Sequence, residues 1–265
     1  MDSLTVYGIQ VTNLTGPLWI DNAKVLAGVY TSHVNPADEK RSIVGNVFGG
    51  QIRLDSHLLF EAESPFRVDA TIANANLQDV AAEVAPQFRD MKGKGLASFQ
   101  MIGNCVDWNS LYGIGNIQLR DAEIYQLPVV LSLLKILRVK EVTTTAFDTS
   151  NINFRLKGDQ IELQRIELIG DAISLIGNGK LNLARDIDLN FYSVVGRNNY
   201  IPLLSELVEL GAQQIMWINI NGNLDNPQTH QNFLPYLNES IKQLFQTPTQ
   251  STLPGRMGSL EIENR

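Results

Sequence analysis

Apolar and polar residues alternate along the chain between Ile152 and Val195. Short runs with this alternation, such as 152–156 and 187–191, are separated by polar or glycine-containing segments such as 157–160. Successive side chains of an extended strand point to opposite faces, and a strand with one buried face shows this period of two. The pattern therefore predicts a meander of antiparallel strands with one apolar and one polar face.

Further strands are expected on both sides of this meander. Segments rich in glycine, proline, asparagine or aspartate separate the other apolar runs, for example at 13–17 and 49–50, and such clusters mark turns. The strands predicted from these signals span residues 4–11, 18–30, 43–48, 51–60, 66–72, 96–103, 117–119, 123–125 and 217–221.

Two segments have clear helical signals. Residues 77–85 follow Asn76, a residue type that caps helix N-termini, and end before Pro86. Residues 127–137 place apolar side chains around most of a helix circumference, so this helix must be covered on nearly all sides. Two further helices and a disordered tail rich in Thr, Pro, Ser and Gly are expected at 201–215, 232–245 and 247–265, respectively.

Together these elements predict a mainly β protein. We expect a curved antiparallel sheet that forms a partly open groove and is capped by a few short α-helices, because one apolar sheet face needs cover from helices, a second sheet or a ligand. Residues 1–246 are expected to form a single domain, or an upstream β repeat at 1–75 followed by a core at 76–246. A closed sandwich or rolled sheet, whose apolar face is simply its core, remains the alternative.

Charge and cysteine content narrow the range of partners. The formal net charge is −7, whereas nucleic-acid binding needs clustered Lys and Arg, so no nucleic-acid partner is expected. Cys105 is the single cysteine, which excludes an intramolecular disulfide and a thiolate cluster. Residues 1–5 lack the features of a signal peptide, and the longest apolar stretch, 127–137, is too short to span a bilayer.

Patterns with recognisable chemistry are scarce. His33, His57 and His230 form no HxH or HxxxH pair, so we expect no metal site. No G-x-S-x-G elbow is present, and the glycine-containing segment 113–118 leads into a strand, unlike a dinucleotide-binding loop. We therefore expect no catalytic residue and no cofactor. The enzymatic alternative is a hydrolase in which His57 or His230 meets a carboxylate.

The order of elements from about Leu77 onward resembles the C-terminal region of AsmA-like proteins, the AsmA/TamB type of periplasmic lipid transporter. The similar stretches are two glycine-led strands at 93–99 and 113–124, an apolar helix at 127–137, paired strands at 147–195 and a closing strand at 218–227 that ends in G-x-L-x-x-P. The resemblance implies a long curved sheet whose apolar trough holds phospholipid acyl chains while the head groups stay in water. It also implies a periplasmic or cell-envelope location and a longer protein with an N-terminal membrane anchor, which is missing from this chain.

The apolar faces of these strands supply the candidate lipid-contacting residues. They are Ile117, Leu119, Phe154, Leu156, Ile161, Leu163, Ile173, Leu175, Leu181 and Leu183. Each acyl methylene moved from water onto such a face gains about 0.8 kcal/mol, so lipid can be held without a polar motif. We expect a non-enzymatic module that moves phospholipid between membranes or supports outer-membrane assembly, with an envelope protein as a further partner. A scaffold that binds a partner chain at an exposed sheet edge is the alternative.

Overall fold

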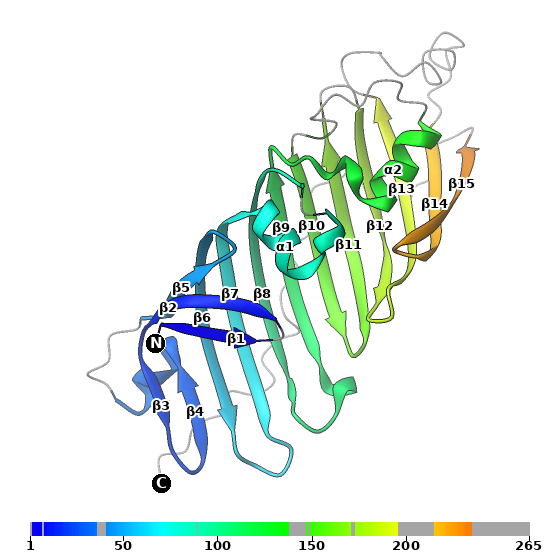
Figure 1. The fold of residues 1–265 in the computed structure, drawn as a ribbon. Helices are drawn as coiled ribbons and strands as arrows, with labels where there is room; N and C mark the ends of the chain where they lie inside the picture. Colours follow the sequence, from blue (N-terminus) through cyan, green and yellow to red (C-terminus); the bar gives the residue numbers. More distant parts are fainter. Residues whose placement is uncertain are drawn as a thin grey trace.

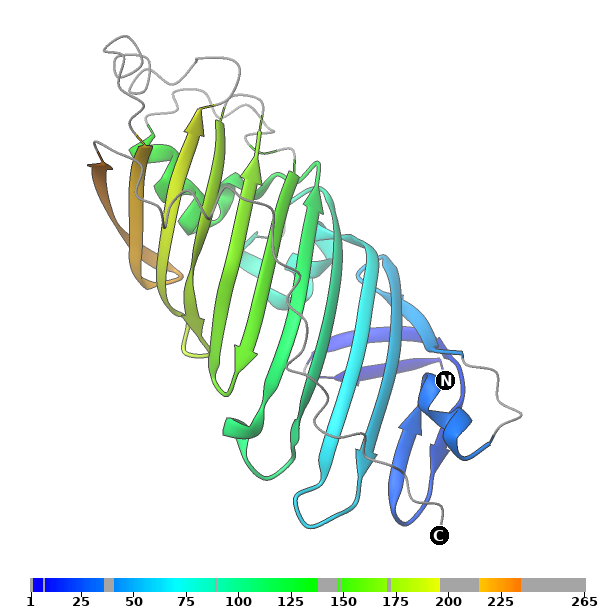
Figure 2. The ribbon, with the colours of Figure 1, turned by 180° about the vertical axis from the view of Figure 1, so that it is seen from behind.

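One large antiparallel sheet contains all the strands of the part of the chain that the structure describes (Figures 1 and 2). The computed structural model describes residues 2–6, 8–35, 41–88, 90–137, 147, 149–170, 173–195 and 215–234. Within them fifteen strands form the sheet, and β1 and β15 at its two ends do not pair with each other, so the sheet is open. The expected fold class, mainly β with an open antiparallel sheet and a few short helices, is confirmed.

The described elements are mostly long strands joined by short connections. The strands are β1 (Ser3–Val6), β2 (Ile9–Thr15), β3 (Leu18–Ile20), β4 (Lys24–Ala27), β5 (Ile43–Val47), β6 (Gly50–Leu59), β7 (Pro65–Asn76), β8 (Lys94–Asn104), β9 (Tyr112–Arg120), β10 (Thr149–Lys157), β11 (Gln160–Ile169), β12 (Ile173–Asn182), β13 (Asp186–Val195), β14 (Ile215–Asn223) and β15 (Asn226–Leu234). The helical segments are η1 (Gly28–His33), α1 (Leu77–Val84), η2 (Pro86–Phe88), η3 (Trp108–Ser110), η4 (Ile124–Gln126) and α2 (Pro128–Ile136). From β5 onward the sheet order follows the chain order, as antiparallel strands with short connections allow.

The meander expected between residues 152 and 195 is present as β10 to β13. In its turns, Gly158 and Arg185 adopt left-handed backbone conformations, with φ of 59° and 70°. The register pairs Ile152 with Ile117 of β9 and with Ile166 of β11. Paired residues share a face of the sheet, so one face is apolar across all three strands. We call this face, against which α2 packs, the inner face and the opposite one the outer face.

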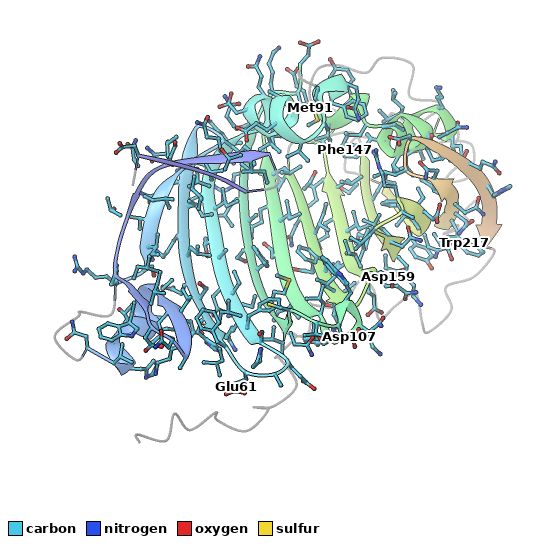
Figure 3. The ribbon with its side chains drawn as sticks, turned by 60° about the horizontal axis from the view of Figure 1, so that its bottom comes forward. Glu61, Met91, Asp107, Phe147, Asp159 and Trp217 are labelled. Carbon is cyan, nitrogen blue, oxygen red and sulfur yellow. The ribbon has the colours of Figure 1, made fainter. Side chains whose placement is uncertain are left out.

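The strand ends form two rims with different connections. At the helix rim, α1 follows β7 and α2 lies between β9 and β10. At the hairpin rim lie the turns at residues 21–23, 60–64, 105–111, 158–159, 183–185 and 224–225. In Figure 3, Glu61, Asp107 and Asp159 mark the hairpin rim, and Met91 and Phe147 lie on the other side.

The most deeply buried part of the inner face lies beneath α2. Leu133 and Leu134 of α2 are buried in one apolar cluster with Leu175 of β12, Leu189 of β13 and Ile218 of β14. Pro128 sits in the first turn of α2, where its missing N–H costs no hydrogen bond. Fully burying one such leucine is worth about 1.5–3 kcal/mol, so α2 holds this end of the sheet firmly.

The N-terminal strands are arranged differently from the prediction. One strand was expected at 4–11, but β1 and β2 form a hairpin with Gly8 at φ 86° between them. One strand was also expected at 18–30. Here the Asp21 carboxylate accepts the backbone N–H groups of Ala23 and Lys24 at 2.7 and 2.9 Å, which turns the chain back into β4 before η1 begins.

The sheet divides at β6. β5 pairs with the first half of this strand, from Gly50 to Leu54, and β4 pairs with the second half, from Ser56 to Leu59. β2 and β1 extend from β5 and cross in front of the neighbouring strands in Figure 1. Two partly buried side chains of β2, Ile9 and Val11, pack against a second buried cluster that contains Phe48.

Two predictions concern the C-terminal part of the chain. A helix was expected at 232–245, but residues 232–234 belong to β15, which pairs with β14 from Ile215 to Asn223. This prediction is wrong at its start, and residues 235–245 lie outside the described residues, as does the tail at 247–265. The helix expected at 201–215 also lies outside them, except for Ile215, which begins β14.

A candidate lipid-binding surface

The inner face carries a continuous apolar surface from β6 to β11. Leu58 of β6 faces Phe66 of β7, Val68 faces Met101 of β8, and Phe154 of β10 faces Leu163 of β11. Each of these side chains is neither buried nor fully exposed. We define the apolar strip as Leu58, Phe66, Val68, Phe99, Met101, Ile117, Phe154, Leu156, Ile161 and Leu163.

Beyond β11 the inner face is covered. Leu175, Phe191, Ile218 and Ile220 on β12 to β14 are all at most 2% exposed. α2 has nine residues and is therefore about 14 Å long, the width of about three strand spacings. A helix of this length can cover one end of the sheet but not the strip beside it. The inner face thus consists of a sealed part next to a partly open part.

Most of the predicted lipid-contacting residues lie on the inner face. The register places Ile117 and Leu119 on β9, Phe154 and Leu156 on β10, Ile161 and Leu163 on β11, and Leu175 and Leu181 on β12 on that face. Ile173 begins β12, but its side chain lies outside the described residues.

Leu175 and Leu183 are predicted residues that lie outside the apolar strip. Leu175 is 0% exposed beneath α2, so it is a core residue. Leu183 follows the end of β12 in a turn of the hairpin rim and is 60% exposed. Alternation alone assigns both residues to the apolar face and contains no information about what covers it.

Sequence reasoning missed the half of the strip that lies on β6 to β8. Leu58, Phe66, Val68, Phe99 and Met101 were not among the candidates, although Phe66, Val68 and Ala70 alternate with polar residues in the same way. β3 adds two more exposed apolar side chains, Leu18 and Ile20, which pair with Ala27 and Val25 of β4. Comparing this segment with the downstream meander would have identified the longer strip.

The outer face is polar and is crossed by side-chain hydrogen bonds. The Asn116 side-chain amide donates to the side-chain oxygens of Asn151 and Asn153 at 2.6 and 2.7 Å. On the neighbouring strand β11, the Arg165 guanidinium bonds to the Glu167 carboxylate at 2.7 Å. A depression of about 300 Å³ on this face is lined mainly by polar side chains, including Arg53, Asp55, Asp69, Ser98, Gln100 and Asn116. These groups suit water and not an acyl chain.

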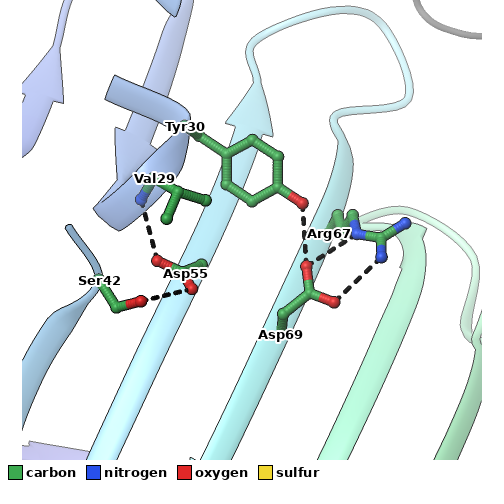
Figure 4. A network of polar contacts seen from close by, with 6 residues as sticks. All are labelled: Val29, Tyr30, Ser42, Asp55, Arg67 and Asp69. Atoms are coloured by element: carbon green, nitrogen blue, oxygen red, sulfur yellow. Dashed lines mark hydrogen bonds and ion pairs between the residues drawn. The ribbon is translucent and has the colours of Figure 1, made fainter. Parts of the chain in front are cut away.

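A polar network on the outer face of β6 and β7 joins Tyr30, Arg67 and Asp69 (Figure 4), and His57 of β6 packs beside it. Tyr30 of η1 donates its hydroxyl to Asp69 at 2.9 Å, and Arg67 bonds to both oxygens of the same carboxylate at 2.8 and 3.0 Å. The His57 ring packs edge-on against the Tyr30 ring, with centroids 4.9 Å apart. Burial, and then the charge of Arg67, lower the pKa of His57, while Asp69 opposes this shift.

These contacts fasten η1 to the sheet. Asp69 already accepts three hydrogen bonds, and Asp55 accepts one from the backbone of Val29 and one from Ser42, both at 2.9 Å. Burial and the bond to Asp69 raise the pKa of Tyr30 to about 12, so its hydroxyl stays protonated at neutral pH. The structure does not bring His230 into this network, because it lies on β15 at the other end of the sheet.

Comparisons with known proteins leave the family open. No protein-family model, no curated protein and no solved structure matches the chain. The resemblance to AsmA-like proteins therefore remains a hypothesis. In the part of the chain that the structure describes, no three His, Cys, Asp or Glu side chains gather as metal ligands, and no helix has the length and apolar character needed to cross a membrane.

Proposed function

We propose that this chain binds phospholipid acyl chains on the apolar strip and acts as a non-enzymatic lipid-handling module of the AsmA-like kind in a Gram-negative type cell envelope. The observation that supports this proposal most strongly is the row of inner-face apolar residues from Leu58 to Leu163 that stays partly accessible to solvent, with Gly113 and Gly115 between the apolar side chains of β8 and β10. If these residues were part of a closed core, their side chains would be buried, as the inner-face side chains beneath α2 are.

The strip is long enough to hold an acyl chain. From β6 to β11 it crosses five strand spacings, which is about 24 Å at ~4.8 Å per spacing. One leaflet of a bilayer accounts for half of a hydrocarbon core of about 30 Å, or ~15 Å per acyl chain. An extended chain can therefore lie across the strands along its whole length, gaining about 0.8 kcal/mol per methylene removed from water.

The same geometry makes selectivity for one lipid head group unnecessary. The strip is apolar, and most polar side chains of these strands, such as Asn116 and Arg165, point to the outer face. Head groups would stay in water at a rim, where no specific partner is needed. A transport surface that must release its cargo benefits from this kind of nonspecific, area-dependent binding.

Native mass spectrometry of the purified full-length chain, combined with lipid extraction, tests the proposal. We expect phospholipid to co-purify and a fluorescent fatty acid to bind the delipidated chain. Absence of lipid together with absence of fatty-acid binding would refute the proposed function.

The second candidate function is a scaffold that recruits a partner chain by adding a strand to the sheet. It is favoured by the open sheet, in which β1 pairs with β2 alone and β15 with β14 alone among the described strands. Unpaired strand edges are templates for strand addition. This function predicts a stoichiometric protein partner in the purified material and no lipid.

A further inference from the structure

The hairpin rim displays a group of exposed apolar side chains. Among the described residues, the tryptophan and phenylalanine side chains that are exposed, Trp19, Phe60 and Trp108, all lie in or next to its turns. Val106 and Trp108 are 71% and 70% exposed, and Ile20 is 63% exposed. Single exposed apolar residues are common on protein surfaces, but a group of aromatic and aliphatic side chains at one edge indicates a binding surface.

These side chains come from three neighbouring turns that are bonded to one another. The backbone N–H of Phe60 donates to the carbonyl of Ala23 at 2.7 Å, and that of Cys105 donates to the carbonyl of Ser64 at 3.2 Å. The turns that follow β3, β6 and β8 therefore form one continuous edge. We define the aromatic rim as Trp19, Ile20, Phe60, Val106 and Trp108.

The turn that carries Val106 and Trp108 is held by polar groups. The Asn104 side-chain oxygen accepts the backbone N–H groups of Val106 and Asp107 at 3.2 and 2.7 Å. Asp107 in turn accepts the backbone N–H of Asn109 at 2.9 Å and caps η3. Because these bonds fix the backbone, the two apolar side chains are not needed to shape the turn, and they project from a well-defined loop.

The charges of the rim select among its conceivable partners. Acidic residues, including Asp21, Glu61, Glu63 and Asp107, outnumber basic ones in these turns. Two rims of this kind would repel each other, which disfavours a second copy of the chain, and an anionic membrane would be repelled as well. A zwitterionic bilayer carries no net charge, and tryptophan prefers its interfacial region.

The rim is also continuous with the apolar strip. Leu58 and Phe66, the paired strip residues on β6 and β7, are each one residue away from the turn that contains Phe60. A bilayer in contact with the rim would therefore lie next to one end of the strip, beside the exposed carboxylates of Glu61 and Glu63 in the same turn.

We propose that the aromatic rim docks on the surface of a zwitterionic phospholipid bilayer, with Trp108 and Val106 inserted into the interfacial region. This inference rests on the proposed function, because docking is useful only if the strip binds acyl chains. Docking would bring the strip to the membrane, so that acyl chains enter it from the side. Docking itself is a separate, measurable property.

Flotation of the full-length chain with phosphatidylcholine vesicles tests docking. The rim variant combines Val106→Ser and Trp108→Ser. The matched control combines Val84→Ser and Ile169→Ser, which removes exposed apolar side chains (60% and 46% exposed) from α1 and from the helix-rim end of β11. We expect the rim variant to lose at least tenfold in vesicle partitioning and the control to change less than twofold, with circular dichroism showing that both are folded.

A fluorescent fatty acid, measured in the absence of vesicles, reports on the strip independently. Docking is supported if the rim variant leaves the vesicles but binds the fatty acid like the wild type. It is overturned, with the proposed function intact, if the wild type binds fatty acid but not vesicles, or if the rim variant still floats. If the wild type floats and the rim variant does not, but neither binds the fatty acid, docking is supported and the acyl-binding function is refuted. Docking would also be overturned if the wild type does not float with vesicles but forms a dimer in sedimentation velocity, and if the rim variant is a monomer.

Discussion

The ring of Phe154 in β10 lies over Gly115 of the neighbouring strand β9. The register pairs the two residues, and a Cβ atom built on Gly115 would lie 2.6 Å from Cε1 of the ring. Phe191 of β13 lies over Gly177 of β12 in the same way, 2.5 Å from such an atom. Each glycine leaves the space that a phenylalanine ring fills, but Phe191 is buried whereas Phe154 is only half-buried.

Alanine at the two glycines should distinguish the sealed part of the inner face from the open part. Gly177→Ala is expected to lower the free energy of unfolding by about 1–3 kcal/mol, because the buried Phe191 ring has no room to move. Gly115→Ala should cost less than about 1 kcal/mol, since the Phe154 ring can turn away from the sheet. Urea denaturation measures both, and equal costs would show that the strip is as tightly packed as the core.

Aspartate at two leucines of the same face should separate binding from folding. Leu163→Asp places a charge on the partly exposed strip, so we expect at least tenfold weaker fatty-acid binding by a chain that still folds. Leu175→Asp buries an unpaired charge beneath α2 and is expected to cost several kcal/mol or prevent folding. Fluorescence titration and thermal denaturation measure the two effects. Comparable loss of stability in both variants would assign Leu163 to the core.

Leu163 and Leu175 also show how far the sequence alone could lead. Both belong to runs in which apolar and polar residues alternate, so the face on which they lie was predictable. The turns between the runs were predictable too, because Gly158 and its polar neighbours favour a reversal of the chain. What covers each leucine depends on α2, which lies far away in the sequence, and no local pattern encodes that contact.

Other elements lacked a distinguishing local signal. β15 runs from Asn226 to Leu234 and pairs with β14. Polar residues such as Thr229 occupy its inner-face positions, so its sequence shows no alternation of apolar and polar residues. The hairpin of β1 and β2 was read as one strand because Gly8 alone interrupts its pattern. Such elements are specified mainly by pairing with their neighbours, which is a property of the folded sheet.

Acidification should weaken the attachment of η1 through His57. The folded chain binds the His57 proton less tightly than the unfolded chain, because burial and Arg67 lower its pKa below the ordinary 6.5. The resulting stabilisation is complete above pH 6.5 and is lost as the pH falls below that value. NMR titration should give a His57 pKa below 6.5. The fall in thermal midpoint from pH 7 to pH 5.5 should be shallower for His57→Gln, and an unchanged slope in this variant would contradict the assignment.

Alkaline pH should act on the same network through Tyr30. Its pKa of about 12 lies above the ordinary value of 10, so the folded chain holds the proton more tightly than the unfolded chain. The stabilisation is complete below pH 10 and is lost as the pH rises from 10 towards 12. Tyr30→Phe removes the hydrogen bond to Asp69 and, since the site is partly exposed, is expected to cost about 1 kcal/mol at pH 7.

The same variant should lose part of the alkaline destabilisation, whereas Tyr125→Phe, which removes a half-buried hydroxyl near the helix rim, should retain it. Urea denaturation at pH 7, 10 and 11 measures the difference. Asp69 keeps its two bonds to Arg67 in either variant, so a change in the pH dependence reports on the Tyr30 hydroxyl alone. If Tyr30→Phe follows the wild-type curve at every pH, the hydroxyl does not hold η1 on the sheet, and the packing of the ring against His57 and the bond from the Val29 backbone to Asp55 must do so.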